Sequence, residues 1–438
     1  MRVSSERSPD RFRPFFGRQE RRMSIGYACL ALAVPGTSIK KCLIRNADGT
    51  RLRDLISRNL RALETMVDYN RESGIRLYRI SSDIIPFASS PVNDVPWETE
   101  YREQLRTIGD KIRAAGMRVS MHPGQYTVLN SPNPETFDNA VRELLYHARF
   151  LDALHVGLTH KIILHVGGVY GDKKQAAQRF AYRYAALDER IRGRLVIEND
   201  DKCYHVEDVL SLGKSLMIPV VFDNLHHAAN PPGVDSTDAD WVAACRETWK
   251  AGDGPQKIHY SQEDPLKRRG AHSATIAADE FLLYMNGLPP EKPDIMLEVK
   301  DKNISALKCI LCTEDRGIGA LEKEWGCYKY LVLEHSQKAY QSIRQLLKDK
   351  AQYPALAFYS LVEEALAQEP DVGSAVNAAN HVWGYFKDIA TATQKERFAG
   401  LMRDYAVGSV SLARVKRSLY ALAEAYPREY LLKSYYFV

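Results

Sequence analysis

The sequence predicts a (β/α)8 barrel followed by a small all-helical domain. Between Met23 and Lys300 the chain holds eight short apolar runs with strand character, each followed by a segment long enough for a helix and its loop. From Lys329 to Val438 helical periodicity continues with no good strand. Eight alternating strand and helix units are typical of a parallel barrel. A doubly wound open sheet has the same local pattern, so periodicity leaves that alternative open.

The expected strands are short and evenly distributed over this part of the chain. They lie at Ile25–Cys29, Arg76–Ser81, Arg118–His122, Lys161–Val166, Leu195–Glu198, Val220–Asp223, Lys257–His259 and Ile295–Glu298. Apolar residues at three-and-four spacing predict helices between them, for example at Leu55–Ser73, Tyr101–Ala115, Glu135–Val156 and Thr275–Met285. The same spacing fills the C-terminal part of the chain, at Tyr340–Asp349, Ala355–Ala367, Val376–Ile389, Lys395–Tyr405 and Ser411–Ala425.

Changes of composition divide the chain into four regions. Residues 1–22 carry seven arginines, three acidic residues and no apolar periodicity, which predicts a basic disordered arm, with Met23 as an alternative start. Residues 23–305 form the predicted barrel, and residues 306–328, which include Asp315-Arg316-Gly317-Ile318-Gly319, a linker. Residues 329–438 form a separate domain of about four to six helices.

The composition sets broad limits on function. A hydrophobic content of 45% allows a substantial core, and a net charge of +5 permits a polyanionic partner without requiring one. Seven scattered cysteines, an odd number, fit reduced thiols in a cytoplasm better than a disulfide framework. No apolar run reaches the length of a membrane span. We therefore expect a cytoplasmic monomer without membrane contact.

Residues of the types that commonly bind metals stand at the carboxyl ends of six of the eight expected strands. They are His122, His165, Glu198, Asp223, His259 and Glu298. In a parallel barrel these ends meet at one face, so residues far apart in sequence gather in one cluster. Three further candidates lie in loops of the same face, namely His226, His272 and Asp83. Asp83 has a second reading as a cap of the following turn, and His227, next to His226, should point elsewhere.

This residue set predicts a metal centre. So many carboxylates and imidazoles in a partly dry cavity would repel each other or stay unsatisfied unless cations neutralised them. At roughly four to six ligands per ion the set suits about two or three divalent ions, and imidazole with carboxylate ligation indicates zinc, manganese or iron. Closely spaced metal ions suit phosphodiester hydrolysis, because they generate hydroxide and stabilise the leaving oxygen.

Lys257 stands two residues before His259 and so faces the same side of its strand. A lysine there has two uses. Its ammonium group can pair with a carboxylate, or its amine can react with CO2 to form a carbamate that bridges metal ions.

Six motifs occur in consistent order along the barrel region. They are Ile25-Gly26-Tyr27-Ala28-Cys29, Tyr78-Arg79-Ile80-Ser81-Ser82-Asp83, Met121-His122-Pro123-Gly124-Gln125-Tyr126, His165-Val166-Gly167-Gly168, Leu195-Val196-Ile197-Glu198-Asn199-Asp200 and Phe222-Asp223-Asn224-Leu225-His226-His227. Together they resemble the UV damage endonucleases, over residues 23–305. In the helical tail, residues 329–336 and 380–386 resemble the YbgA-like domain, whose role is unknown.

The resemblance implies a metal-dependent (β/α)8 barrel, akin to the apurinic endonuclease IV group, that nicks DNA immediately 5′ to UV photoproducts and some other lesions. It implies a cluster of up to three ions, commonly manganese, held by His122, His165, Glu198, Asp223, His226, His259, His272 and Glu298. Glu198, His259, Tyr27 and Lys257, which matches a carboxylated lysine, are the implied catalytic residues.

The resemblance also gives a role to the loop that follows His122. Gln125 and Tyr126 match a pair that wedges into damaged double-stranded DNA, where an amide and an aromatic ring can fill the stack beside an extruded lesion. Tyr27, at the end of the first strand, is expected to line the lesion pocket.

Two other functions fit parts of the pattern. Sugar isomerases and epimerases on the same fold also hold divalent metals with Glu, Asp and His, but they need fewer ions and give Gln125 and Tyr126 no purpose. A non-catalytic adaptor that binds damaged DNA and recruits partners through its helical tail is the second alternative.

Overall fold

The computed structural model describes residues 23–438, so the arm predicted for residues 1–22 lies outside the described residues. Eight parallel strands form one sheet in the order β6-β5-β4-β3-β2-β1-β8-β7. Their bounds are β1 Ile25–Ala28, β2 Leu77–Ile80, β3 Arg118–Met121, β4 Ile162–His165, β5 Leu195–Glu198, β6 Val220–Val221, β7 Lys257–Tyr260 and β8 Asp294–Leu297.

The two outer strands of the sheet meet, which makes it a barrel. A parallel bridge joins Asp223 to His259, and the amide of His259 donates to the carbonyl of Phe222 over 2.9 Å. The predicted (β/α)8 barrel is confirmed, and the open-sheet alternative is wrong.

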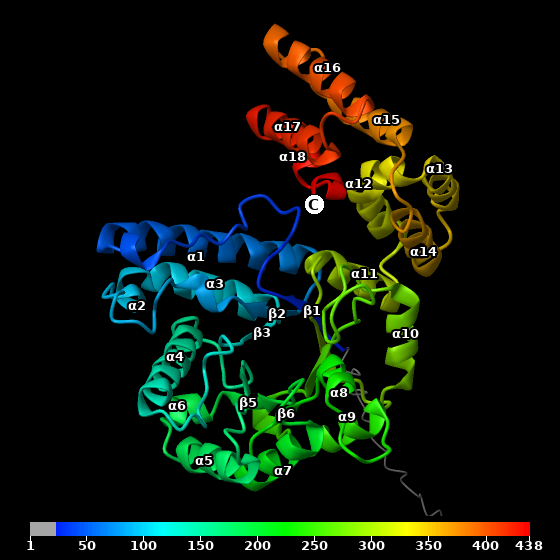
Figure 1. The fold of residues 1–438 in the computed structure, drawn as a ribbon. Helices are drawn as coiled ribbons and strands as arrows, with labels where there is room; N and C mark the ends of the chain where they lie inside the picture. The colour runs from blue at the N-terminus through cyan, green and yellow to red at the C-terminus, as the bar shows by residue number, and fades with distance from the viewer. Residues whose placement is uncertain (1–22) are drawn as a thin grey trace, which may run out of the picture.

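Helices surround the sheet (Figure 1). They are α1 Gly49–Glu72, α2 Trp97–Glu100, α3 Arg102–Ala114, α4 Pro134–Ala153, α5 Lys173–Ala185, α6 Glu189–Arg192, α7 Val206–Leu216, α8 Asn224–Ala229, α9 Asp238–Arg246, α10 Ala278–Gly287 and α11 Asn303–Thr313. The first helix begins six residues before the expected Leu55, because its first turn is polar and shows no apolar periodicity; the side chain of Asp48 caps it instead.

Alternation along each strand decides what faces the barrel interior. Ala28, Leu77 and Met296 contact one another inside the barrel. Two residues further along β2, Arg79 points the same way, and Glu298 follows Met296 by the same step. The inward-facing polar side chains therefore lie one layer above these apolar side chains, at the carboxyl ends of the strands.

The stretch 306–328, expected as a linker, is mostly helical. Residues 306–313 belong to α11, where Ala306, Cys309 and Ile310 are buried in the barrel core. After a short connection, α12 (Ile318–His335) enters the C-terminal helical region. The sequence misled here because α11 is apolar nearly all round, which hides the three-and-four spacing of a surface helix.

The C-terminal region stands above the barrel in Figure 1 and is helical throughout. After α12 come α13 Gln337–Leu346, α14 Ala355–Leu366, α15 Val372–Trp383, α16 Ala392–Ala406, α17 Leu412–Ala425 and the short α18 Glu429–Leu432. This matches the predicted all-helical tail. Among residues 23–438, no helix combines the length and the apolar character that crossing a bilayer requires.

The helical region is packed firmly against the barrel. Glu363 of α14 accepts a hydrogen bond from the amide of Ala278, at the start of α10, over 3.1 Å, and it pairs with the buried Lys308 of α11 over 2.6 Å. Ile304 and Leu311 of α11 share one hydrophobic cluster with residues of α12 to α14. These contacts fix the position of the helical region relative to the barrel.

A buried acid in α12 gives the helical region a pH-dependent stability. Burial raises the pKa of Glu324 to about 7, while the hydroxyls of Tyr359 and Tyr435 donate to its carboxyl group over 3.2 Å each. Because the folded-state pKa lies above the ordinary 4.5, the folded chain holds the proton more tightly. Stability is fully present below about pH 4.5 and is lost as the pH rises through about 7.

We expect Glu324→Gln to remove this dependence. Relative to the unchanged chain, the variant should gain up to about 3 kcal/mol between about pH 5 and about pH 8. Thermal or denaturant unfolding at both pH values measures the difference. The same difference between variant and parent at both pH values would show that Glu324 stays ionised in the folded protein.

Candidate metal centre

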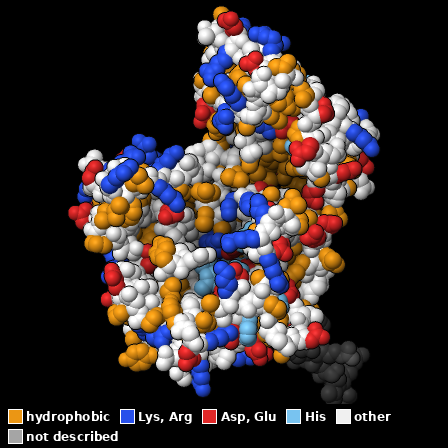
Figure 2. Space-filling view, in the orientation of Figure 1, with side chains coloured by type: hydrophobic (Ala, Val, Ile, Leu, Met, Phe, Trp, Pro, Cys, Tyr) orange, Lys and Arg blue, Asp and Glu red, His pale blue; other side chains and the backbone are white. Residues whose placement is uncertain are grey.

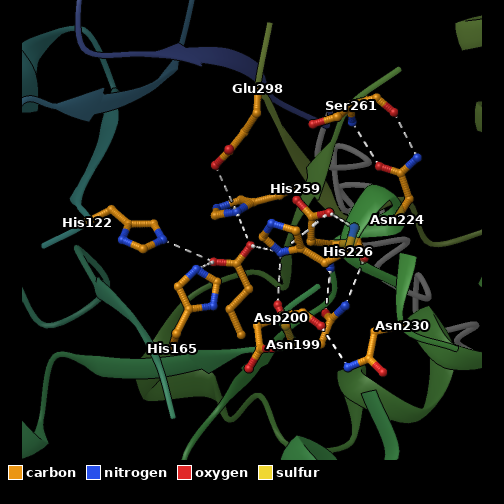
Figure 3. Close-up of polar contacts among 12 residues, drawn as sticks. His122, His165, Asn199, Asp200, Asn224, His226, Asn230, His259, Ser261 and Glu298 are labelled. Carbon is orange, nitrogen blue, oxygen red and sulfur yellow. Dashed lines mark hydrogen bonds and ion pairs between the residues drawn. The ribbon is translucent and has the colours of Figure 1, made fainter. Parts of the chain in front are cut away.

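The centre of the site is the carboxylate of Glu198, the buried last residue of β5. His259 Nδ1 lies 2.8 Å from its Oε1, and His122 Nε2 lies 3.2 Å from its Oε2 (Figure 3). His165 Nε2 lies 3.8 Å from Oε2, and His226 Nδ1 lies 3.7 Å from Oε1. Four imidazoles from four different strand ends and loops thus surround one carboxylate.

These side chains form two ligand sets that share Glu198. His122, His165 and Glu198 offer ligand atoms within 4.8 Å of one another, and so do Glu198, Asp223 and His259. Glu198 is therefore the one residue common to both candidate sets. The register of the sheet creates the first set, since His165 and Glu198 are directly paired on β4 and β5.

Glu298 extends the cluster on its other side. Its Oε1 lies 3.3 Å from His259 Nδ1, and its Oε2 lies 3.9 Å from His272 Nδ1. Arg79 of β2 forms an ion pair with the same carboxylate. All eight predicted ligands therefore join one network, with His272, on the loop after β7, at its edge.

The electrostatics of the site differ from residue to residue. Burial raises the pKa of Asp223, and the charges of Asp223, Glu198 and Glu298 outweigh burial and raise the pKa of His226 to about 9. Burial alone would raise the pKa of Glu198, but the charges of His259 and His165 and hydrogen bonds from His122 and His259 hold it well below its ordinary value. Burial lowers the pKa of His165 to about 4. Deprotonated carboxylates and neutral rings are the forms that bind metal ions.

Three buried nitrogen and oxygen atoms of the cluster are suited to binding metal ions. His165 Nδ1, His259 Nε2 and Asp223 Oδ2 are buried, and within residues 23–438 no hydrogen-bond partner reaches them. A buried polar atom without a partner costs free energy that a bound cation would recover. The donors are nitrogen and oxygen only, which suits zinc, manganese or iron.

Backbone contacts orient two of the rings. His226 Nδ1 lies 3.0 Å from the carbonyl of Asn199, and His122 Nδ1 lies 3.1 Å from the carbonyl of Pro123. If each Nδ1 carries the proton and donates it, Nε2 is left with a free lone pair, as a metal ligand requires.

Sequence reasoning missed several residues that hold this arrangement. Arg79 balances Glu298, and Asn199 binds the backbone of Asp223 through both amide atoms, at 2.9 and 3.0 Å. Ser82 donates to the carbonyl of His122 over 2.7 Å and contacts His147 Nε2 at 2.9 Å. Arg79 and Asn199 both lie within the six motifs of the barrel region. The inward position of Arg79 on its strand was the sequence signal that could have revealed its role.

The position of Tyr27 contradicts its expected role. Its side chain has no exposed surface, packs against Tyr78, and donates from its hydroxyl to Asn70 of α1 over 2.9 Å. Because the neighbouring Ala28 faces the barrel interior, Tyr27 faces the helices and cannot line a lesion pocket in this structure.

Asp83 and His227 also lie outside the cluster. Asp83 is exposed and pairs with Lys41 over 2.6 Å, so it is not placed as a ligand. His227 packs against Phe222 and Trp241, as expected of a residue that points away from His226.

Lys257 is buried at the start of β7, in the same strand as His259. Burial, together with the positive charges of Arg118 and Arg79, lowers the pKa of its amine well below the ordinary value. The side chain thus lies beneath the ligand layer in an environment that favours a neutral amine.

The loop after β3 presents a different surface. Gln125 and Tyr126 are exposed, Tyr126 by 68%, only three and four residues after His122. Partial burial and the carboxylate of Glu143 raise the pKa of Tyr126 to about 12, so its phenol stays neutral. The chain therefore exposes a planar amide and an aromatic ring within four residues of His122 in sequence.

The profile of the UV-endonuclease UvdE family matches residues 23–323 of this chain. The chain belongs to this family. A UV DNA damage endonuclease of Clostridium perfringens is 34% identical over 403 residues, which cover 91% of this chain and 97% of the relative. A Bacillus cereus (strain Q1) protein of the same name is 33% identical over 298 residues, 67% of this chain and 93% of its own length.

The UvdE family also has a solved structure similar to this one. The crystal structure of SacUVDE has 37% sequence identity and a TM-score of 0.63, and the match covers 66% of this chain and 97% of that chain. Residues 329–438 match a second family, described as a protein of unknown function (DUF1722). The two profiles meet within α12.

Replacing the central carboxylate should empty the site. Glu198→Gln removes the charge shared by both ligand sets, so we expect loss of bound divalent metal and a fall in nicking of at least about 100-fold. Metal analysis of the purified protein and a plasmid-nicking assay measure the two effects. Asp83→Asn is the matched control and should keep both; a loss of metal in that variant would return Asp83 to the ligand set.

Removing the hydroxyl of Tyr27 should affect stability alone. In Tyr27→Phe the buried hydrogen bond to Asn70 is lost, which should cost about 1 kcal/mol of unfolding free energy. Nicking rate and lesion preference should stay within about twofold, since no atom of Tyr27 is exposed. A selective loss of lesion preference in a stably folded variant would restore the pocket role.

Proposed function

We propose that this chain is a metal-dependent endonuclease that nicks damaged double-stranded DNA immediately 5′ to UV photoproducts, cyclobutane dimers and 6-4 photoproducts, and at some other lesions. One observation carries the proposal. In a barrel of the UV-endonuclease family, seven carboxylate and imidazole side chains join in one network with Glu198, and the exposed pair Gln125–Tyr126 begins three residues after the candidate ligand His122.

The eight clustered residues would hold two to three ions, which we propose to be manganese, with zinc and iron as alternatives of the same ligand chemistry. When bound, such ions supply a hydroxide near neutral pH and stabilise charge on the phosphate. Glu198 would hold the ligand position that both sets share, His259 would bind beside it, and Arg79 would keep Glu298 ionised and in place.

Lys257 has a proposed role beneath the ligand layer. Its buried position on the same strand face as His259 supports the carbamate that the family resemblance implies. A carbamate at this position would replace a buried amine by a bridging anion and would so complete the ligand set.

Recognition would fall to the loop after β3. A planar amide and a neutral phenol ring can stack in the gap that an extruded dinucleotide leaves, because every base offers them a flat face. Their closeness to His122 would couple the opening of the lesion to the scissile phosphate. We also propose that the enzyme acts as a monomer in the cytoplasm.

The alternatives fit the site less well. A sugar isomerase needs no exposed wedge, and a binding adaptor needs no buried centre with unpartnered ligand atoms such as His259 Nε2 and Asp223 Oδ2. Family membership favours the nuclease over both.

The decisive experiment uses the purified protein and a duplex with one defined cyclobutane dimer. With Mn2+ present, a single nick on the 5′ side of the dimer is expected, with no nick in the undamaged duplex. A nick elsewhere would correct the cut site, and tight lesion binding without any nick would favour the adaptor.

Two substitutions should separate cleavage from recognition. Tyr126→Ala should keep the metal content and lose preference for damaged DNA by at least about tenfold, since one stacking residue is worth roughly 1–3 kcal/mol. His122→Ala should lose metal and cleavage together. Equal metal loss in both variants would show that the loop and the centre are one structural unit.

A further inference from the structure

The helical region carries a groove that is separate from the metal centre. It lies between α16 and α17 and has a volume of about 750 Å3. Its floor is apolar, with Leu401 and Leu422 buried and Gly400 contributing no side chain. The two helices are joined by the short connection 407–411 and form a hairpin, so the end of α16 lies near the start of α17.

Three arginines line this groove, Arg397 from α16 and Arg414 and Arg417 from α17. All three are exposed, and among residues 23–438 no carboxylate lies within ion-pairing distance of any of them. The neighbouring Lys416, by contrast, pairs with Glu334 over 2.6 Å. The lining contains a single acidic side chain, Asp404, so the groove carries a net positive charge.

The start of α17 adds to this positive potential. Arg414 stands in the first turn, which contains no acidic residue, and the side chain of the N-cap Ser411 makes no capping hydrogen bond. A cation at a helix N-terminus is unfavourable by roughly 0.3–1 kcal/mol, and the uncapped N–H groups still need acceptors. An anion bound here would satisfy both requirements.

The cations are spread along the groove and do not converge on one point. From Asp404, near the start of α17, to Arg397 is seven residues, or about 10 Å of helix. Phosphates on one DNA strand advance by about 3.4 Å each along the duplex axis, so a row of this length can contact more than one phosphate. A single small phosphate ester would leave part of the row unused.

The groove also lies where a long duplex can reach it. Figure 2 shows pale blue histidines in a hollow of the barrel, Lys and Arg side chains directly above that hollow, and more Lys and Arg along the helical region over α16 and α17. The contacts of Glu363 with α10 and α11 hold the two parts in fixed relation.

We propose that the groove between α16 and α17 binds the phosphate backbone of the DNA beyond the lesion. The identity of the duplex as substrate rests on the proposed function, but the groove itself is an independent binding site. It lengthens the bound stretch of DNA and leaves the chemistry to the barrel. The Bacillus cereus relative supports this division, because its 298 aligned residues make up 93% of its length and leave too little for a second domain of this size.

The test compares two duplexes of about 40 and about 12 base pairs, or about 135 and 40 Å, each with and without a central photoproduct. The variant is Arg397→Gln/Arg414→Gln/Arg417→Gln, and Lys338→Gln on the exposed face of α13 is the control. For the long duplex, affinity should fall at least about tenfold, and the slope of log Kd against log salt should fall by about 2 to 3. Binding and single-turnover nicking of the short duplex should stay within about twofold.

A second variant distinguishes a loss of DNA binding from a loss of folding. Gly400→Glu adds a carboxylate to the groove floor, where a Cβ would meet only Arg403 Nη2 at 3.9 Å, so folding should be unaffected. It should weaken binding of the long duplex in the same direction as the triple variant, with a melting temperature no lower than the parent's, because glycine inside a helix is the less stable residue.

Equal salt slopes in the triple variant and the parent would overturn the proposal, as would equal weakening of short and long duplexes. Loss of inorganic phosphate or ATP binding with unchanged long-duplex affinity would assign the groove to a small ligand instead. Because the undamaged long duplex is measured as well, a parent protein that binds but never nicks would overturn the proposed function without affecting this conclusion.

Discussion

The burial of the Glu198 carboxylate is the constraint on which the rest of the site depends. A carboxylate without exposed surface is tolerated only with positive or donor groups around it. Here His122, His165, His226 and His259 provide them, each from a different strand end or the loop beyond it. Any change that removes the Glu198 carboxylate from this position would take away the one residue common to both candidate ligand sets.

The closure of the barrel and the site are one structure. The bridge between Asp223 and His259 joins the outer strands, and both residues are also candidate metal ligands. Asp223 in addition caps α8 by accepting from the amide of His226 over 2.7 Å. Metal binding and sheet closure should therefore stabilise each other, since ligands that a fold already holds in place cost little entropy to organise.

The barrel holds the candidate metal centre, and the helical region holds the groove that we propose to lengthen the bound stretch of DNA. In the barrel, the polar residues at strand ends face inward and contact one another around Glu198. In the helical region, the arginines of α16 and α17 are exposed and uncompensated within the described residues. The buried pair of Lys308 and Glu363 makes this division workable, because it fixes one part against the other.

The sequence alone predicted a barrel of eight strands and the eight candidate ligands that the structure brings into one network. It did so because a residue at the carboxyl end of a parallel strand has only one face of the barrel to occupy. It also predicted that His227 points away, since adjacent residues cannot share a direction.

Only the tertiary structure decided which way Tyr27 points, that Asp83 pairs with Lys41, and that Arg79 balances Glu298. The sequence of the short strand β1 does not determine which of its faces points into the barrel. Contacts with Leu77 and Met296, far away in sequence, decide it. The same holds for residues 306–313 of α11, which show no surface period because some pack in the barrel core and others against the helical region. Local patterns carry periodicity, whereas burial and charge pairing depend on which segments meet.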